Sequence, residues 1–177
     1  YPIKGYNFIE GVAALIIKNY PDVKLYVGGY NITKSDTIKD KLKISYYGKY
    51  IKELIEKYNL QKNVLFTGLL DEKQMCERYL QSHVFICPSS IENSPNSLGE
   101  AMILGVPCVA SGVGGVPYLL NQTNAGLVYQ ADASYMLAHY VCEIFSSDKL
   151  ALNISKKARE HAKITHNVQT NLNNLIN

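Results

Sequence analysis

The segment from Glu92 to Glu100 places two carboxylates on either side of a turn and a helix start. The apolar residues 84–87 precede this segment, and the apolar residues 101–104 follow it. The first turn of a helix has unpaired backbone N–H groups and a partial positive charge, so it attracts anions such as phosphate. Carboxylates accept hydrogen bonds from hydroxyl groups, such as those of a sugar. The segment therefore indicates a site for a ligand with both groups, such as a sugar nucleotide.

Length and composition limit the classes of protein to which these residues can belong. The 177 residues suffice for one domain around a single core, and the 47% hydrophobic and 19% charged fractions are typical of a globular protein. A net charge of +3 is too weak to indicate nucleic-acid binding. No apolar run approaches the roughly 20 residues that span a bilayer. With four separated cysteines, expected to be reduced, and no visible secretory signal, we expect a cytoplasmic location.

Short apolar strands alternate with amphipathic helices along the chain. Strands are predicted at residues 24–27, 63–67, 84–87, 107–110 and 125–129, and helices at 7–19, 44–58, 71–81, 101–104, 134–146, 148–163 and 167–176. This alternation predicts an α/β fold in which helices cover both faces of a parallel sheet. Ligands of such sheets bind outside the carboxyl ends of the strands. The loops 1–5, 28–31, 68–71, 89–97 and 111–115 should therefore line the binding crevice.

Several further motifs occur in a fixed order around the Glu pair. They are Lys4-Gly5, Pro21-Asp22, Val27-Gly28, Val64-Leu-Phe-Thr-Gly68, Glu92-x7-Glu100, Gly99-Glu-Ala-Met102, Gly105-Val-Pro107 and Gly112-Val-Gly-Gly-Val-Pro117. Together they resemble the C-terminal, donor-binding domain of GT-B glycosyltransferases, in the retaining group 1 marked by Glu-x7-Glu. The resemblance covers nearly the whole chain and implies a Rossmann-like, doubly wound parallel sheet. We expect residues 1–177 to be one nucleotide-sugar-binding domain of a longer two-domain enzyme.

The resemblance implies catalytic roles for Glu92 and Lys4. In the family, the first Glu contacts the donor sugar and is essential to transfer, and the Lys reaches the diphosphate. The second Glu binds the ribose hydroxyls, a role that passes to Glu100. Simpler interpretations remain open for each residue. Glu92 could be a solvated loop carboxylate, Lys4 a surface lysine, and Ser97-Leu-Gly-Glu100 a capping box that needs no ligand.

The remaining predicted donor-binding residues lie in three loops. Asn96, Ser97 and Leu98 occupy the turn between the two Glu, where the N–H groups of Ser97 and Leu98 should face the distal phosphate or the sugar. Gly68-Leu69 matches the loop whose backbone contacts the base, and Gly28-Gly29 lets the chain approach the phosphates closely. The resemblance implies no bound metal and no other cofactor, and the four histidines show no metal-ligand spacing.

The implied reaction is retaining transfer of a sugar from a nucleoside diphosphate to an acceptor hydroxyl, in surface or capsular polysaccharide synthesis. The partners would be the nucleotide sugar and an N-terminal acceptor domain, and no nucleic acid. The chain opens on Tyr1-Pro2 without Met, so we expect a fragment that lacks the family's first, central strand and binds donor without transferring sugar. The Lys-rich residues 34–62 could form a solvated face or contact the inner face of a membrane.

Two other functions are compatible with the same chain. One is a sugar-nucleotide epimerase of the same two-domain architecture, although such enzymes lack this Glu-x7-Glu with its Gly-Glu-Ala helix. The other is a non-catalytic module that binds a nucleotide or a partner protein. The sequence leaves open the base and sugar of the donor, the acceptor, the linkage and the oligomeric state.

Overall fold

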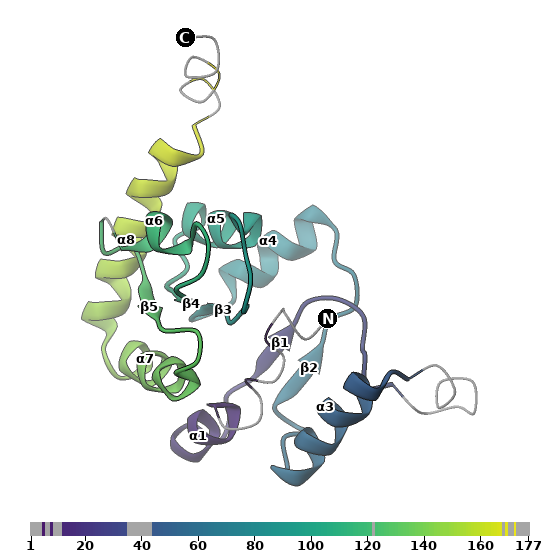
Figure 1. Cartoon of the computed structure of the whole chain (residues 1–177). Coiled ribbons are helices and arrows are strands. Elements are labelled where there is room, and N and C mark those ends of the chain that lie inside the picture. The colour runs from purple at the N-terminus through teal and green to yellow at the C-terminus, as the bar shows by residue number, and fades with distance from the viewer. Residues whose placement is uncertain are drawn as a thin grey trace.

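The computed structural model describes residues 5, 8, 12–34, 44–121, 123–167, 169 and 172. Elements there follow the predicted order (Figure 1). The strands are β1 (Leu25–Val27), β2 (Val64–Phe66), β3 (Phe85–Cys87), β4 (Cys108–Ser111) and β5 (Leu127–Tyr129). The helices are α1 (Val12–Asn19), α3 (Tyr46–Lys57), α4 (Glu72–Leu80), α5 (Asn96–Ile103), α6 (Val116–Leu120), α7 (Ser134–Ser146) and α8 (Asp148–Thr165). The helix predicted at 167–176 lies largely outside the described residues.

The five strands pair only in parallel, in two sheets. β1 pairs with β2, and β3, β4 and β5 form a second sheet in this order. A Rossmann-like sheet has the strand order 3-2-1-4-5-6, so a first strand would lie between β1 and β3. The two sheets are separate at that place in the described part of the chain. The predicted fold class, with parallel strands flanked by helices, is confirmed, while the lack of a first strand stays a prediction.

Helices cover both faces of the sheets, as a doubly wound fold requires (Figure 1). The core beside α1, α3 and α7 includes Val12, Ile51, Leu54, Val109 and Leu137. The core beside α4, α5, α6 and α8 includes Leu98, Met102, Cys108, Leu120 and Ala158. Strand β4 contributes Val109 to the first cluster and Cys108 and Ala110 to the second, because successive side chains of a strand point to opposite faces.

Two helix boundaries follow directly from local sequence. The predicted capping box at the start of α4 is confirmed, because the Asp71 side chain accepts from the Gln74 N–H and the Gln74 side chain accepts from the Asp71 N–H. Helix α5 stops at Gly105, whose φ of 75° suits glycine. The Gly105 and Val106 N–H groups donate back to Met102 and Ala101 over 3.0 and 2.9 Å, which is a Schellman motif.

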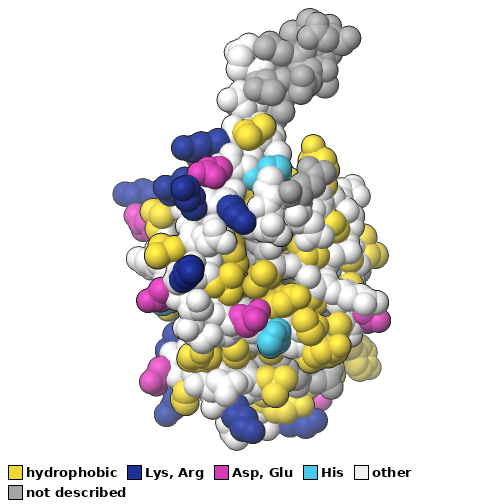
Figure 2. Space-filling view, turned by 90° about the vertical axis from the view of Figure 1, so that its left-hand side faces the viewer, with side chains coloured by type: hydrophobic (Ala, Val, Ile, Leu, Met, Phe, Trp, Pro, Cys, Tyr) yellow, Lys and Arg dark blue, Asp and Glu magenta, His cyan; other side chains and the backbone are white. Residues whose placement is uncertain are grey.

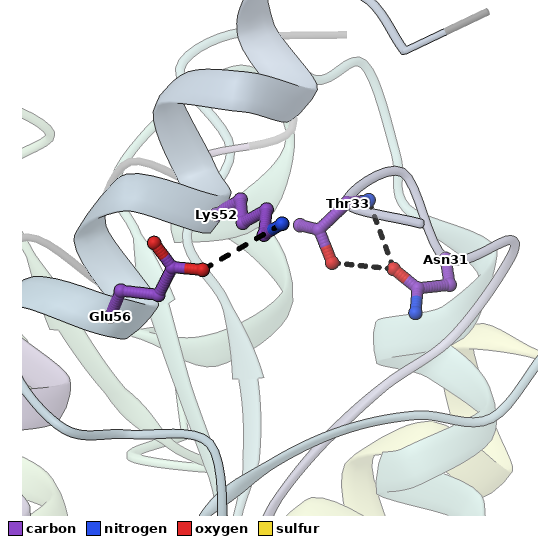
Figure 3. Close-up of polar contacts among 4 residues, drawn as sticks. All are labelled: Asn31, Thr33, Lys52 and Glu56. Atoms are coloured by element: carbon purple, nitrogen blue, oxygen red, sulfur yellow. Dashed lines mark hydrogen bonds and ion pairs between the residues drawn. The ribbon is translucent and has the colours of Figure 1, made fainter. Parts of the chain in front are cut away.

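The chain turns back soon after β1. The Asn31 Oδ1 accepts hydrogen bonds from the N–H and the hydroxyl of Thr33 over 2.9 and 2.7 Å (Figure 3). This local bond stabilises a turn just beyond Gly28-Gly29. On the neighbouring α3, Lys52 and Glu56 form an exposed ion pair of 3.7 Å, one helical turn apart (Figure 3). Such a pair favours a solvated face for the part of the Lys-rich stretch that lies on α3.

The outer face built by α7 and α8 mixes all types of side chain. Lysine and arginine lie there among acidic and hydrophobic groups (Figure 2). Tyr135, Leu152 and Ile164 are exposed hydrophobic residues of these two helices. None of the helices among the described residues has the length and apolar character needed to cross a membrane.

Candidate functional site

The two glycine loops after β1 and β2 lie side by side. The Gly29 N–H donates to the Gly68 carbonyl over 3.0 Å, and the two residues form an isolated antiparallel bridge. A Cβ on Gly28, Gly29 or Gly68 would meet no heavy atom within 4 Å, so the space beside these backbones is open. Leu69 follows with 68% of its surface exposed. The structure thus brings together the loops predicted to contact the phosphates and the base, with room for a ligand.

Glu92 is held by a buried serine of its own loop, two residues after β3. The Ser89 hydroxyl donates to the Glu92 Oε1 over 2.9 Å, and Ser89 is only 3% exposed. The Ser111 hydroxyl, at the end of β4, lies within hydrogen-bond distance of the carbonyl oxygens of Ser89 and Cys87. These bonds connect the carboxyl ends of the two neighbouring strands to the predicted catalytic carboxylate, which is itself partly exposed.

The Gly-rich loop after β4 packs against the backbone beside Glu92. A Cβ on Gly114 would overlap the Glu92 carbonyl oxygen, and the φ of Gly114 is 53°. The Gly115 N–H donates to the Asn93 carbonyl over 2.5 Å, and a Cβ there would stand 2.5 Å from the same oxygen. Glycine is therefore required at both positions for this close approach of two backbones, which fixes the loop that contains Glu92.

Helix α5 begins without a side-chain cap. Its N-cap residue is Pro95, and no side chain accepts a hydrogen bond from the first turn. The Leu98 N–H donates to the Pro95 carbonyl over 3.0 Å, and the Leu98 side chain is fully buried. The Leu98 N–H, which was predicted to face the phosphate or the sugar, is thus already hydrogen-bonded to the N-cap residue of α5. The open end of α5 starts with the N–H groups of Asn96 and Ser97.

The capping-box interpretation of Ser97 and Glu100 is wrong. Pro95 precedes the helix, so Ser97 lies inside the first turn and Glu100 is the fifth helical residue. The exposed Glu100 side chain turns instead toward α4, where its Oε2 lies 3.0 Å from the Tyr79 hydroxyl. A carboxylate that does not cap its own helix keeps acceptor capacity for a ligand.

Helix α8 holds the far side of α5. The Arg159 guanidinium donates to the carbonyls of Ile103 and Leu104 over 3.3 and 3.0 Å, which satisfies the last turn of α5 and places a cation at its negative end. At the other end, a Cβ on Gly99 would overlap the His166 ring. The helix that presents the candidate site is thus packed against α8 along its length.

Lys4, metal binding and a surface hollow are separate from the loops and the helix start described above. Lys4 lies outside the described residues. The described residues include no group of three or more His, Cys, Asp or Glu side chains that could hold a metal ion. A shallow surface hollow between α1 and α7 lies among residues that were not predicted to bind donor, namely Asn19, Tyr20, His139, Cys142, Glu143 and Ser146.

Sequence reasoning missed three supporting residues, namely Ser89, Ser111 and Tyr79. The two serines are the first residues of two loops predicted to line the crevice, and this position was a usable signal. Tyr79 had no comparable signal, because it contacts Glu100 only through the packing of α4 against α5. Burial raises the pKa of Tyr79 far above its ordinary value, and the nearby Glu100 carboxylate adds to this rise.

Comparison with known proteins identifies the family. The model of Glycosyl transferases group 1 matches residues 2–161. N-acetyl-alpha-D-glucosaminyl L-malate synthase of Bacillus anthracis is 27% identical over 110 residues, which are 62% of this chain and 28% of that protein. The chain spans less than half the length of the curated relatives that it matches.

Solved structures agree with the expected fold. The C-terminal domain of LpcC, a group 1 glycosyl transferase of Francisella tularensis, aligns with a TM-score of 0.77 at 22% identity, over 96% of this chain and 83% of that one. HepE of Anabaena, solved in complex with UDP-glucose, aligns with a TM-score of 0.77 at 21% identity, over 98% of this chain and 45% of that one. The Rossmann-like fold of a C-terminal GT-B domain is thereby confirmed, and the family match over nearly the whole chain shows that the protein belongs to the glycosyl transferases group 1.

Proposed function

We propose that this chain is the donor-binding domain of a retaining glycosyltransferase that takes its sugar from a nucleoside diphosphate. The main support is the arrangement of Glu92 and Glu100 around the uncapped start of α5. Both carboxylates are oriented by hydroxyl groups, Glu92 by Ser89 of its own loop and Glu100 by Tyr79 of α4. A helix start that lacks its own cap is suited to an anionic group. HepE, which has the same fold, was solved with UDP-glucose.

Each part of the donor has a proposed partner. The phosphates would bind at the start of α5, where the Asn96 and Ser97 N–H groups come first and the Leu98 N–H is already used. Lys4 would add a cation that offsets charge on the diphosphate as the glycosidic bond breaks. Gly28-Gly29 and Gly68-Leu69 would lie along the phosphates and the base. Their support is the open space beside the glycines.

The two carboxylates would have separate tasks. Glu100 would accept hydrogen bonds from the vicinal ribose hydroxyls, because an ionised carboxylate has acceptors for both. Glu92 would place the donor sugar or stabilise positive charge on an oxocarbenium-like transition state. The Ser89 hydroxyl would keep the Glu92 carboxylate in one orientation during this step. Transfer to the acceptor hydroxyl with retention of configuration is part of the proposal, as is transfer without a metal.

The acceptor is proposed to bind outside this chain. The chain matches less than half the length of its curated relatives, so the rest of such a protein has room for a second domain. Active sites commonly form where two domains meet. We therefore propose that residues 1–177 bind donor but need an N-terminal acceptor domain for transfer. A role in surface or capsular polysaccharide synthesis, at the cytoplasmic side of the membrane, stays a prediction from the sequence.

A thermal-shift measurement of the chain with UDP-, GDP- and ADP-sugars tests donor binding. A ligand at a concentration of about 100 Kd adds roughly 2.7 kcal/mol to the free energy of unfolding. For a chain of this length that corresponds to a rise in Tm of about 5–10 °C. Glu100→Gln should reduce the rise, and Glu53→Gln, on the exposed face of α3, is the matched control and should not. A chain that none of the three nucleotide sugars stabilises contradicts the proposal.

Catalysis needs a polypeptide that contains both domains. There, Glu92→Ala should abolish sugar transfer while leaving the thermal shift by the nucleotide within a few degrees of the wild type. Unchanged transfer would exclude the catalytic role of Glu92 and favour a merely structural one. Incubation with the donor alone distinguishes the epimerase alternative, because an epimerase converts the donor without any acceptor.

A further inference from the structure

Tyr79 of α4 places its hydroxyl group between two acceptors of α5. The Tyr79 Oη lies 3.0 Å from the Glu100 Oε2 and 3.2 Å from the Ser97 carbonyl oxygen. The pair is 21 residues apart in sequence, and α4, β3 and α5 contribute residues to the same core cluster. This is a contact from another element to a residue that the proposed function places at the donor ribose.

The direction of the hydrogen bond is fixed by chemistry. An ionised carboxylate and a carbonyl oxygen are both acceptors, so the single hydrogen between them must belong to Tyr79. A tyrosinate at this place would repel the Glu100 carboxylate. Burial and the nearby Glu100 carboxylate accordingly raise the pKa of Tyr79, so the hydroxyl keeps its hydrogen at neutral pH. Tyr79 therefore remains a donor to these two acceptors, and the shorter contact is the one to Glu100.

The two partners differ in freedom of movement. Tyr79 is 5% exposed, and its ring packs edge-to-face on Phe85 of β3 with centroids 5.6 Å apart. Glu100 is exposed, and a free Glu side chain loses up to about 2 kcal/mol of rotamer entropy when it is fixed. The Tyr79 hydroxyl already holds one oxygen of the Glu100 carboxylate in place. Ligand binding therefore costs less of the rotamer entropy of Glu100.

We propose that Tyr79 is a positioning residue that orients the Glu100 carboxylate toward the ribose hydroxyls of the donor. Oε2 receives the Tyr79 hydrogen, while Oε1 and the remaining lone pair of Oε2 accept from the ribose. The inference rests on the proposed function, because it assumes that Glu100 binds ribose. It adds a residue that determines how well the site distinguishes ribonucleotides from deoxyribonucleotides.

Calorimetric titration of the protein with UDP, GDP and ADP identifies the base with the highest affinity, and the 2′-deoxy form of that nucleotide is then compared with it. We expect Tyr79→Phe to lower the affinity for the ribonucleotide by about tenfold, the effect of losing one hydrogen bond to a charged group. The affinity for the 2′-deoxy form should fall by less. Glu100→Gln should remove the same preference, and the double variant should resemble Glu100→Gln alone.

Tyr20→Phe is the matched control. It removes a tyrosine hydroxyl that lies 3.5 Å from the Cys142 carbonyl, between α1 and α7 and away from the site, and should leave both affinities unchanged. A general loss of packing would weaken both nucleotides equally, whereas loss of positioning reduces their ratio. If Tyr79→Phe fails to fold, Glu100→Asp tests the same contact, because the shorter side chain withdraws the carboxylate from the Tyr79 hydroxyl.

The outcomes separate the two levels of inference. If Glu100→Gln removes the ribose preference and Tyr79→Phe leaves it intact, the positioning role of Tyr79 is overturned and the proposed function stands. If Glu100→Gln also leaves the preference intact, the ribose contact of Glu100 is wrong and the role of Tyr79 falls with it. Failure of all three nucleotides to bind overturns the proposed function and this inference together.

Discussion

Replacing Gly114 by Ala should destabilise the protein because two independent costs coincide there. The φ of Gly114 is 53°, and an added Cβ would overlap the Glu92 carbonyl oxygen. A left-handed conformation costs a non-glycine residue about 1–2 kcal/mol. Overpacking costs about 1–3 kcal/mol more, and here the neighbour is backbone that cannot rotate away. The gain from a less flexible unfolded chain returns only about 0.4–1 kcal/mol. The net loss is about 2–4 kcal/mol.

Three other glycines in loops of the candidate site carry only one of these two costs, or neither. Gly68 has a φ of 74° and open space, so Gly68→Ala should lose only about 1 kcal/mol. Gly115 has a φ of −80° but a Cβ would stand 2.5 Å from the Asn93 carbonyl, so Gly115→Ala should lose about 1–2 kcal/mol. Gly28 has open space and no positive φ, so Gly28→Ala should be neutral or slightly stabilising.

Urea unfolding of the four variants measures each free energy, with the m-value as a check on the unfolded state. Thermal unfolding should show the same order, at about 2–4 °C for each kcal/mol. The reasoning is refuted if Gly114→Ala is no less stable than Gly68→Ala, since the overlap with Glu92 would then have no cost. Gly28→Ala adds a second test, because it should weaken nucleotide binding without any loss of stability.

Three further predictions concern contacts of single side chains. Ser89→Ala removes the hydrogen-bond donor to Glu92. Steady-state kinetics of the two-domain enzyme should show that sugar transfer falls about tenfold. Urea unfolding should show that the free energy of unfolding falls by only about 1 kcal/mol. Arg159→Ala leaves two carbonyls at the end of α5 without their donor, and urea unfolding should show a loss of about 1 kcal/mol. Burial raises the pKa values of Tyr79 and Tyr129, so the folded state keeps protons that the unfolded chain releases above about pH 10. The free energy of unfolding should therefore fall between pH 9 and pH 11, and should fall less in Tyr129→Phe.

The last two of these predictions have their own control or contradicting outcome. Lys156→Ala removes a cation of α8 whose exposed pair with Glu160 measures 4.0 Å, and its effect should stay within about 0.5 kcal/mol. An equal loss in Lys156→Ala and Arg159→Ala would show that charge on α8, and not the cap on α5, is responsible. Constant stability between pH 9 and pH 11 would contradict the burial of the two tyrosine hydroxyls.

The predictable parts of the fold are those encoded by neighbours in sequence. Asp71 and Gln74 form their capping box because three residues separate them, and Gly105 ends α5 because only local backbone geometry is involved. Ser97 and Glu100 have a similar spacing but do not form a box. Pro95, which fixes its own φ and has no N–H, becomes the N-cap, so the helix starts one residue before Ser97.

The candidate site was predictable in its ligand-facing residues and not in their support. Glu92 and Glu100 could be found from motif order, which resembles a known family. Tyr79, which orients Glu100, depends on which helices become neighbours in space. Ser89, which orients Glu92, lies only three residues before it in the same loop, but no motif marked it. No periodicity in the sequence reports that a tyrosine of one helix meets a carboxylate of another. The role of Lys4 stays a prediction, because the residue lies outside the described part of the chain.

The division of the sheet between β1 and β3 has a consequence for backbone amides. The Leu25 N–H donates to Asn63 and the Phe85 N–H donates to Pro107, so alternation along a parallel strand turns the Tyr26 and Ile86 N–H groups the opposite way. They point to edges that have no strand neighbour among the described residues. An extended segment that runs between β1 and β3 would have to accept from both. Slow hydrogen exchange at the Tyr26 and Ile86 amides would therefore reveal that an extended segment bridges the sheet of β1 and β2 and the sheet of β3, β4 and β5. Fast exchange would reveal that each sheet ends at these strands.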